Sequence, residues 1–140
     1  MIVLDTNVIS ETLRLRPDSR VIEWLAALSD DVAISTITLA ELLTGVRRLP
    51  PSRRRSELET AIELAIQPYR GSRSLLAFDE AAAAEYAEVL VARERAGAPI
   101  SMADAQIAAI CRVHRATCAT RNTKDFAHVG IDLVDPWRAA

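Results

Sequence analysis

Short apolar runs alternate with longer helix-forming stretches along the whole chain, and this order limits the folds open to it. The first run, Ile2–Leu4, lacks the polar alternation of a half-exposed strand and is typical of a buried parallel strand. Further strands are predicted at 32–35, 75–78, 117–119 and 131–134, and helices at 7–13, 18–28, 38–48, 52–67, 79–96 and 101–115. Strands that alternate with helices predict a three-layer α/β/α fold around a central, mainly parallel sheet of about five strands.

The chain's 140 residues are enough for one domain with a sizeable core, and 50% of them are apolar. We therefore expect residues 1–140 to form a single domain. No apolar run approaches the ~20 residues that span a bilayer, and the N-terminus lacks the basic-then-apolar order of a signal peptide. We expect a cytoplasmic protein without a membrane partner. Cys111 and Cys118 are isolated thiols and, together with the two histidines, lack the spacing of a zinc finger.

Four carboxylates stand where predicted strands give way to helices or loops: Asp5, Glu41, Asp104 and Asp125. If the strands form one parallel sheet, these junctions lie along its carboxyl edge, where open α/β sheets place their sites. Carboxylates crowded there would repel one another, and some would protonate unless a cation held them together. Hard oxygen ligands suit Mg²⁺ or Mn²⁺. The pattern predicts a metal-dependent phosphodiesterase and favours a ribonuclease.

Each of these acids also has a purely structural interpretation. Glu41 and Asp104 both occupy the fourth position of a capping-box pattern, 38–41 and 101–104, where a carboxylate complements the helix dipole. Asp5 could cap the first helix, and Asp125 could belong to an ordinary Asx turn. Their common place at one predicted edge of the sheet favours a site over four separate caps.

The basic residues are almost all arginine, since Lys124 is the single lysine among seventeen. Arginine offers a planar fork suited to phosphate, although the formal net charge of −2 does not itself argue for a nucleic-acid partner. Five arginines gather between Arg47 and Arg55, where they could bind RNA phosphates. The alternative is a solvated face with intrahelical ion pairs, such as Arg53 with Glu57 or Arg55 with Glu59.

Several segments together carry a resemblance to a known family. They are 2–7, 35–41 with Leu42, Leu43 and Gly45, 101–104 with Ile107 and Ala108, 120–126, and 130–137. In this order they resemble a PIN-domain protein, specifically a VapC-type toxin ribonuclease of a type II toxin–antitoxin system. The ending resembles the plasmid-stability branch of that group. The stretch from Arg47 to Arg73 matches no motif of the family.

The resemblance implies a PIN fold, related to the RNase H-like and flap-endonuclease-like folds, and a Mg²⁺- or Mn²⁺-dependent endoribonuclease that leaves 5′-phosphate and 3′-hydroxyl ends. Asp5 would be the central metal ligand and Asp104 a second direct ligand. Glu41 would complete the metal shell directly or through water, and Asp125 would be the outer member. A cognate antitoxin and a homodimer are implied as partners, and the arginine cluster could bind an acidic antitoxin segment instead of RNA.

Five further residues match polar positions of the family motifs. Those that would orient ligands or contact phosphate are Thr6, Asn7, Thr120 and Asn122. Arg121 would bind the scissile phosphate. The alternatives are capping and turn formation for the first four residues, and an ion pair with an acid for Arg121.

Two other functions remain open at this point. A haloacid-dehalogenase-like phosphatase would use Asp5 as nucleophile, but Asn7 stands where that chemistry needs a second acid. The second alternative is a catalytically silent PIN fold that binds RNA or a protein partner. His114 and His128 are not well placed for an acid–base mechanism without metal.

Overall fold

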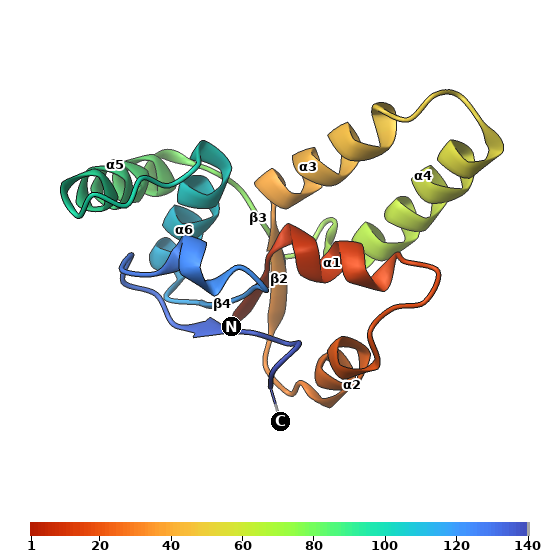
Figure 1. The fold of residues 1–140 in the computed structure, drawn as a ribbon, viewed down its shortest axis with the longest axis horizontal. Helices are drawn as coiled ribbons and strands as arrows, with labels where there is room; N and C mark the ends of the chain where they lie inside the picture. Colours follow the sequence, from red (N-terminus) through yellow and green to blue (C-terminus); the bar gives the residue numbers. More distant parts are fainter. Residues whose placement is uncertain (140) are drawn as a thin grey trace.

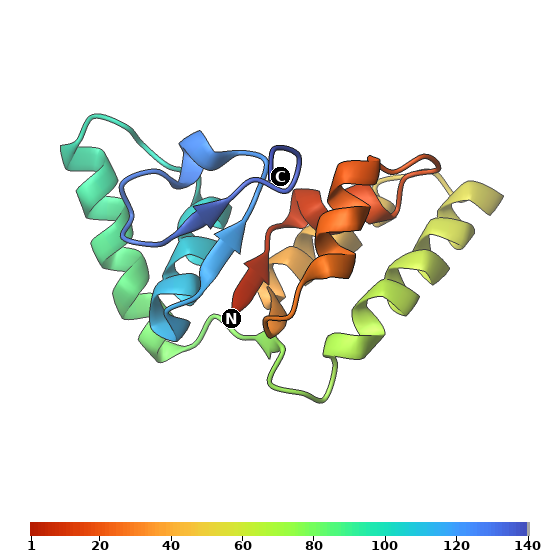
Figure 2. The same cartoon turned by 90° about the horizontal axis from the view of Figure 1, so that it is seen from below.

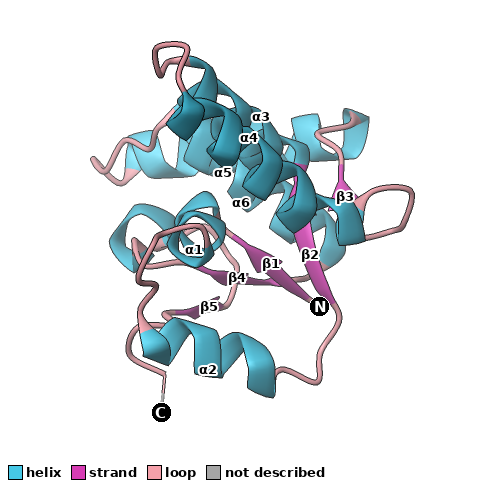
Figure 3. Cartoon of the chain, turned by 90° about the vertical axis from the view of Figure 1, so that its right-hand side faces the viewer, coloured by secondary structure: helices cyan, strands magenta, loops and turns pink. Residues whose placement is uncertain are grey.

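The computed structural model describes residues 1–139 and contains a five-stranded sheet in the order β3-β2-β1-β4-β5 (Figures 1 and 3). Every pairing is parallel. The strands are β1 (Ile2–Leu4), β2 (Val32–Ser35), β3 (Leu75–Leu76), β4 (Thr117–Ala119) and β5 (Leu133–Val134). The predicted fold class is therefore confirmed, although the strands predicted at 75–78 and 131–134 pair over only two residues each.

Helices cover both faces of this sheet. They are α1 (Thr6–Thr12), α2 (Ser19–Ala27), α3 (Thr36–Arg47), α4 (Arg53–Ile66), α5 (Glu80–Arg95) and α6 (Met102–His114), with short 3₁₀ turns η1 (Gln67–Tyr69) and η2 (Thr123–Phe126). Figures 1 and 2 show the α3–α4 hairpin and the α5–α6 pair on opposite sides of the molecule. None of the helices in the described residues combines the length and apolarity needed to cross a lipid bilayer.

The alternation of side chains along β1 separates two cores. Val3 is fully buried in a cluster formed with α5 and α6, which also contains Cys111 and Cys118. Ile2 and Leu4 point the other way, into a cluster formed with α1, α2, α3 and α4. Because apolar residues meet helices on both faces, the central strand needs no polar alternation, as its sequence predicted.

Two local predictions were wrong. The pattern 38–41 does not open a helix: α3 begins at Thr36, and its N-cap is Ser35, whose hydroxyl accepts a hydrogen bond from Thr38 N at 3.1 Å. Glu41 therefore lies beyond the first turn. Asp104 does not follow a strand, since α6 comes directly after the loop from α5. The capping pattern at 101–104 is real, with Ser101 Oγ accepting from Asp104 N at 3.2 Å.

Candidate active site

Asp5 follows β1 directly and is 5% exposed. It is the N-cap of α1, because its Oδ1 accepts a hydrogen bond from Thr6 N at 2.8 Å. Its Oδ2 accepts a hydrogen bond at 2.7 Å from the hydroxyl of Thr120, the residue that follows β4. Asp5 can therefore cap α1 and also belong to a functional site, because both of its oxygens are held in place at the carboxyl ends of β1 and β4.

Glu41 is tied to the same strand end through Thr6. The Thr6 hydroxyl donates to Glu41 Oε1 at 2.6 Å and lies 3.1 Å from Thr38 Oγ1. Thr38 is fully buried, so the contact fixes the start of α3 against the start of α1. The structure therefore places a carboxylate from α3 beside the one that follows β1.

Asp104 and Asp125 come from the other half of the chain. Asp104 lies in the first turn of α6, and Asp125 lies in η2. The backbone of η2 is held by Arg93, which is 6% exposed and whose Nη1 donates to the carbonyl oxygens of Asp125 at 2.8 Å and Ala127 at 3.1 Å. No sequence pattern marks this role, because Arg93 resembles any other charged residue near a helix end.

A hollow of about 400 Å³ lies at the carboxyl edge of the sheet. Three of the four predicted acids line it: Asp5, Glu41 and Asp104. Asp125 does not line it, but its charge acts on Asp104, as the pKa values below indicate. The predicted acids are therefore gathered at one place, with three around the hollow and the fourth beside them.

Two of these acids, Asp5 and Asp104, have raised pKa values. Burial, and then the charges of Asp104 and Glu41, raise the pKa of Asp5 to about 6 in spite of hydrogen bonds from Thr120 and Thr6. Burial also raises the pKa of Asp104, with further contributions from Asp125 and Glu41. The hollow thus contains more negative charge than the protein itself compensates, which is the condition under which a bound cation is favourable.

Thr120 is the centre of a polar network that includes the predicted supporting residues. Its fully buried hydroxyl accepts hydrogen bonds from Asn122 N at 3.0 Å and from Asn7 Nδ2 at 3.4 Å. Its own proton is therefore directed to Asp5. Asn7 Oδ1 in turn accepts from Arg121 N at 3.3 Å. The network connects α1 to the loop after β4 and fixes the orientation of the Asp5 carboxylate.

Arg121 does not pair with an acid, because in residues 1–139 no carboxylate lies within ion-pair distance of it. Its guanidinium carbon instead lies 5.0 Å from the centre of the Trp137 ring. Trp137 also lines the hollow, together with Ser10, Glu11 and Arg14 of the α1 segment. The sequence interpretation missed these four residues. For the three in the α1 segment, the only signal was their spacing after Asn7, which is that of one helix face.

The donor set fits a hydrated hard cation. Within the described chain, no three His, Cys, Asp or Glu side chains stand close enough to hold a metal ion by themselves. The oxygen ligands in the lining are nevertheless carboxylate, amide and hydroxyl oxygens, and the raised pKa of Asp5, chiefly due to burial, shows that its negative charge is poorly solvated. Mg²⁺ commonly keeps several waters and takes only one or two carboxylates, so water can fill the remaining positions.

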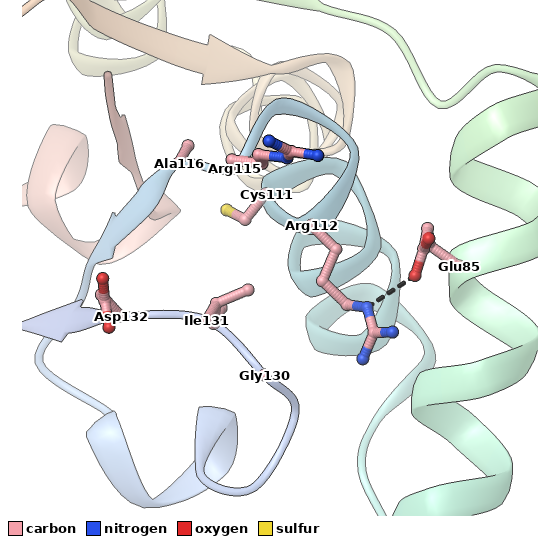
Figure 4. A pocket seen from close by; sticks show the side chains of 8 residues that line it. All are labelled: Glu85, Cys111, Arg112, Arg115, Ala116, Gly130, Ile131 and Asp132. Carbon is pink, nitrogen blue, oxygen red and sulfur yellow. Dashed lines mark hydrogen bonds and ion pairs between the residues drawn. The ribbon is translucent and has the colours of Figure 1, made fainter.

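A second hollow, of about 570 Å³, lies between α5, α6 and the segment before β5 (Figure 4). The Arg112 guanidinium crosses it, donating to Glu85 Oε2 at 2.6 Å and to Val129 O at 3.0 Å. None of the predicted site residues lines it. These contacts are those of a structural ion pair, and the first hollow remains the candidate active site.

The arginine cluster of the α3–α4 hairpin forms the intrahelical pairs that its sequence predicted. Arg53 lies 3.5 Å from Glu57, and Arg55 lies 2.8 Å from Glu59. The first pair is well exposed on both sides, so it contributes little to stability.

Comparisons with known proteins agree with this fold. The sequence profile described as "PIN domain" matches residues 2–132. The chain is 42% identical to toxin FitB of Neisseria gonorrhoeae over 98% of this chain and 99% of that protein. It is 38% identical to VapC ribonuclease Y4jK of Sinorhizobium fredii over 100% of both. A solved structure of FitAB bound to an IR36 DNA fragment aligns with a TM-score of 0.91 and 40% identity, covering 100% of this chain and 98% of that one. The chain belongs to the PIN-domain family.

Proposed function

We propose that this protein is a metal-dependent endoribonuclease that hydrolyses RNA phosphodiester bonds and is the toxin of a toxin–antitoxin pair. One observation carries the proposal: carboxylates from three separate elements, Asp5, Glu41 and Asp104, line one hollow at the carboxyl edge of the sheet. The relatives support it, because one is named a VapC ribonuclease and another a toxin. Membership of the PIN-domain family removes the basis of the phosphatase interpretation.

The acids have distinct roles in this proposal. Asp5 is the central ligand of Mg²⁺ or Mn²⁺, and Asp104 is a second direct ligand. Glu41 binds the ion directly or through water, and Asp125 is the outer member beside Asp104. When bound, such an ion activates water near neutral pH and polarises the phosphoryl oxygens.

The neighbouring polar residues position the ligands. Thr120 and the backbone of Thr6 hold the two oxygens of Asp5, while the Thr6 side chain holds Glu41. Asn7 and Asn122 orient Thr120, so that its proton points to Asp5. With both oxygens of Asp5 fixed before substrate arrives, little reorganisation is needed when charge develops at phosphorus. Preference for RNA would come from the shape of the surface and from contacts to the 2′-hydroxyl.

A cognate antitoxin is the proposed protein partner, since the solved relative is a FitAB assembly on DNA. This chain offers such a partner an apolar groove of about 820 Å³ between α1, α3 and α4. Leu15 lies at the edge of that groove with 98% of its surface exposed, and Leu58 and Ile62 lie along it. A homodimer remains a prediction.

The proposal is tested by incubating labelled total RNA with purified protein shown to be free of antitoxin, in Mg²⁺, Mn²⁺ or EDTA. Discrete fragments with 5′-phosphate ends should form only with metal and should disappear with Asp5→Asn. The matched control is Glu88→Gln, which removes an exposed acid of α5 and should cleave normally. Intact RNA in every lane, with binding visible in a gel-shift assay, would favour the catalytically silent RNA-binding module instead.

A further inference from the structure

The candidate active site is strongly acidic for a pocket that receives a polyanion. Four carboxylates line it: Asp5, Glu11, Glu41 and Asp104. Within residues 1–139 its lining contains two cationic side chains, Arg14 and Arg121. Because RNA phosphates are repelled by the acids wherever no cation intervenes, these two guanidiniums decide where a backbone can approach.

Arg121 is held beside the acids. It follows Thr120, which contacts Asp5, and its guanidinium is stacked on the indole of Trp137 at 5.0 Å. Trp137 is 4% exposed, and its backbone N donates to Asp135 Oδ1 at 2.9 Å, so the indole ring under Arg121 is held in place. A stacked guanidinium keeps its N–H edge available, which suits it to hold a phosphate at little cost in side-chain entropy.

Arg14 lies two residues beyond the end of α1. Its Nη1 lies 3.3 Å from Glu11 Oε1, while 66% of the arginine side chain stays exposed. Glu11 is 4% exposed, and its Oε2 accepts a hydrogen bond from Asp18 N at 2.9 Å, at the start of α2. This buried acid is thus anchored by the α2 N-terminus and fixes the position of Arg14 through a single contact that leaves most of the guanidinium free.

Both arginines line the same pocket as the acids. Arg121 follows Thr120, whose hydroxyl contacts Asp5, and Arg14 lies two residues beyond the end of α1. The lining therefore offers a backbone phosphate two separate cationic groups.

We propose that Arg14, anchored by Glu11, binds a backbone phosphate of the RNA next to the one that the family resemblance gives to Arg121, and that Trp137 positions Arg121 for its own phosphate contact. This inference rests on the proposed ribonuclease function and extends it: the RNA backbone passes the part of the pocket that Ser10, Glu11 and Arg14 line. Glu11 and Trp137 are positioning residues, since each acts through its arginine.

The test measures binding of a labelled single-stranded RNA oligonucleotide in the Asp5→Asn background, which prevents cleavage, over a range of NaCl concentrations. Arg14→Gln and Arg121→Gln should each weaken binding about fivefold, and each should reduce the slope of log K against log salt by roughly 0.7, the value for one lost phosphate contact on a single strand. The matched control is Arg73→Gln, which removes an exposed arginine of the loop before β3 and should leave the slope unchanged.

The positioning residues have their own readouts. Glu11→Gln keeps an acceptor for Asp18 N but removes the charge that holds Arg14, so it should raise KM while kcat stays near the wild-type value. Trp137→Phe keeps an aromatic face and should rescue most of the affinity lost in Trp137→Leu. In the Trp24→Phe variant Trp137 is the single tryptophan, and its fluorescence should change when RNA binds.

Each outcome decides a different statement. A smaller slope of log K against log salt in both arginine variants, but not in Arg73→Gln, supports the two phosphate contacts. Unchanged binding in both variants, while the wild type still cleaves RNA with metal, overturns these contacts but not the proposed ribonuclease activity. An equal loss in the Arg73 control also overturns these contacts, because binding would then follow overall charge. A wild-type protein that neither cleaves nor binds RNA overturns the proposed function itself.

Discussion

Neutralising Asp5 should make the metal-free protein more stable. The folded state raises the pKa of this carboxyl from 3.8 to about 6, chiefly through burial. Because a tenfold change in proton affinity corresponds to about 1.4 kcal/mol, the ionised form destabilises the fold by about 3 kcal/mol above pH 6. Asn keeps an acceptor for Thr6 N and carries no charge, but its NH2 group replaces the oxygen that accepts from Thr120. Because that lost hydrogen bond costs about 1 kcal/mol, Asp5→Asn should recover about 1–2 kcal/mol. For a chain of this size that corresponds to a rise in Tm of roughly 3–8 °C.

The pH dependence makes this prediction specific. Because the folded pKa lies above the unfolded value, the penalty is absent below about pH 3.8, grows as the pH rises, and is complete above about pH 6. Thermal unfolding in EDTA, followed by circular dichroism, should therefore show the full gain at pH 7.5 and a clearly smaller gain at pH 5. Glu88→Gln, which neutralises an exposed acid, should show no such trend.

Metal supplies an independent check of the same reasoning. A divalent ion at ten times its Kd should stabilise the wild type by about 1.4 kcal/mol and the Asn variant much less, so the gap between them should narrow. A variant that is no more stable than the wild type at pH 7.5, or a gain that is equal at pH 5 and pH 7.5, would refute the claim that uncompensated charge at Asp5 strains the fold.

Three further changes follow from contacts described above. Thr120→Val removes the hydroxyl that donates to Asp5 and should raise the pKa of that carboxyl further, as a carbon-13 NMR titration of the metal-free protein would show. Arg93→Met removes the donor for three backbone carbonyls and should cost about 2–4 kcal/mol in urea unfolding, with a fall in kcat as η2 loosens. Gly130→Ala adds a Cβ at φ +76° only 3.3 Å from Arg112 Nη1 and should cost about 1–2 kcal/mol in the same assay, whereas an unchanged midpoint would show that the loop adapts freely.

The fold could be predicted because its signals are local. Each strand is a short apolar run, and most helices begin at a residue type that can cap them. The side chains of Asp18, Ser52 and Asp79 each accept a hydrogen bond from the first turn of their helix. The predicted start of α3 was wrong because two overlapping capping patterns occur there, and the side chain of Ser35 rather than that of Thr38 accepts the capping hydrogen bond. Sequence spacing alone does not decide between two such caps, since the choice depends on where the preceding strand ends.

The acids of the candidate site could be proposed because they stand close to element boundaries, which the sequence marks. Residues that contact the site from distant segments of the chain could not be proposed from the sequence. Arg93 reaches η2 over a separation of 32 residues, and Trp137 meets Arg121 from beyond β5, in another segment of the fold. Such contacts depend on how layers pack, and no periodicity within one helix reports on them. Glu11 was missed because a carboxylate on a helix ordinarily faces solvent, whereas here a helix N-terminus covers it.

The central place of β1 has a consequence for synthesis of the protein. This strand is synthesised well before β4, with which it pairs, and Asp5 receives one of its two hydrogen bonds from a residue 115 positions later. At about 5–20 residues per second, roughly ten seconds pass before that partner exists. The pocket therefore cannot assemble on a nascent or truncated chain. The proposed site would be complete only after the segment around Thr120 has been synthesised, so the proposed activity cannot precede that point of translation.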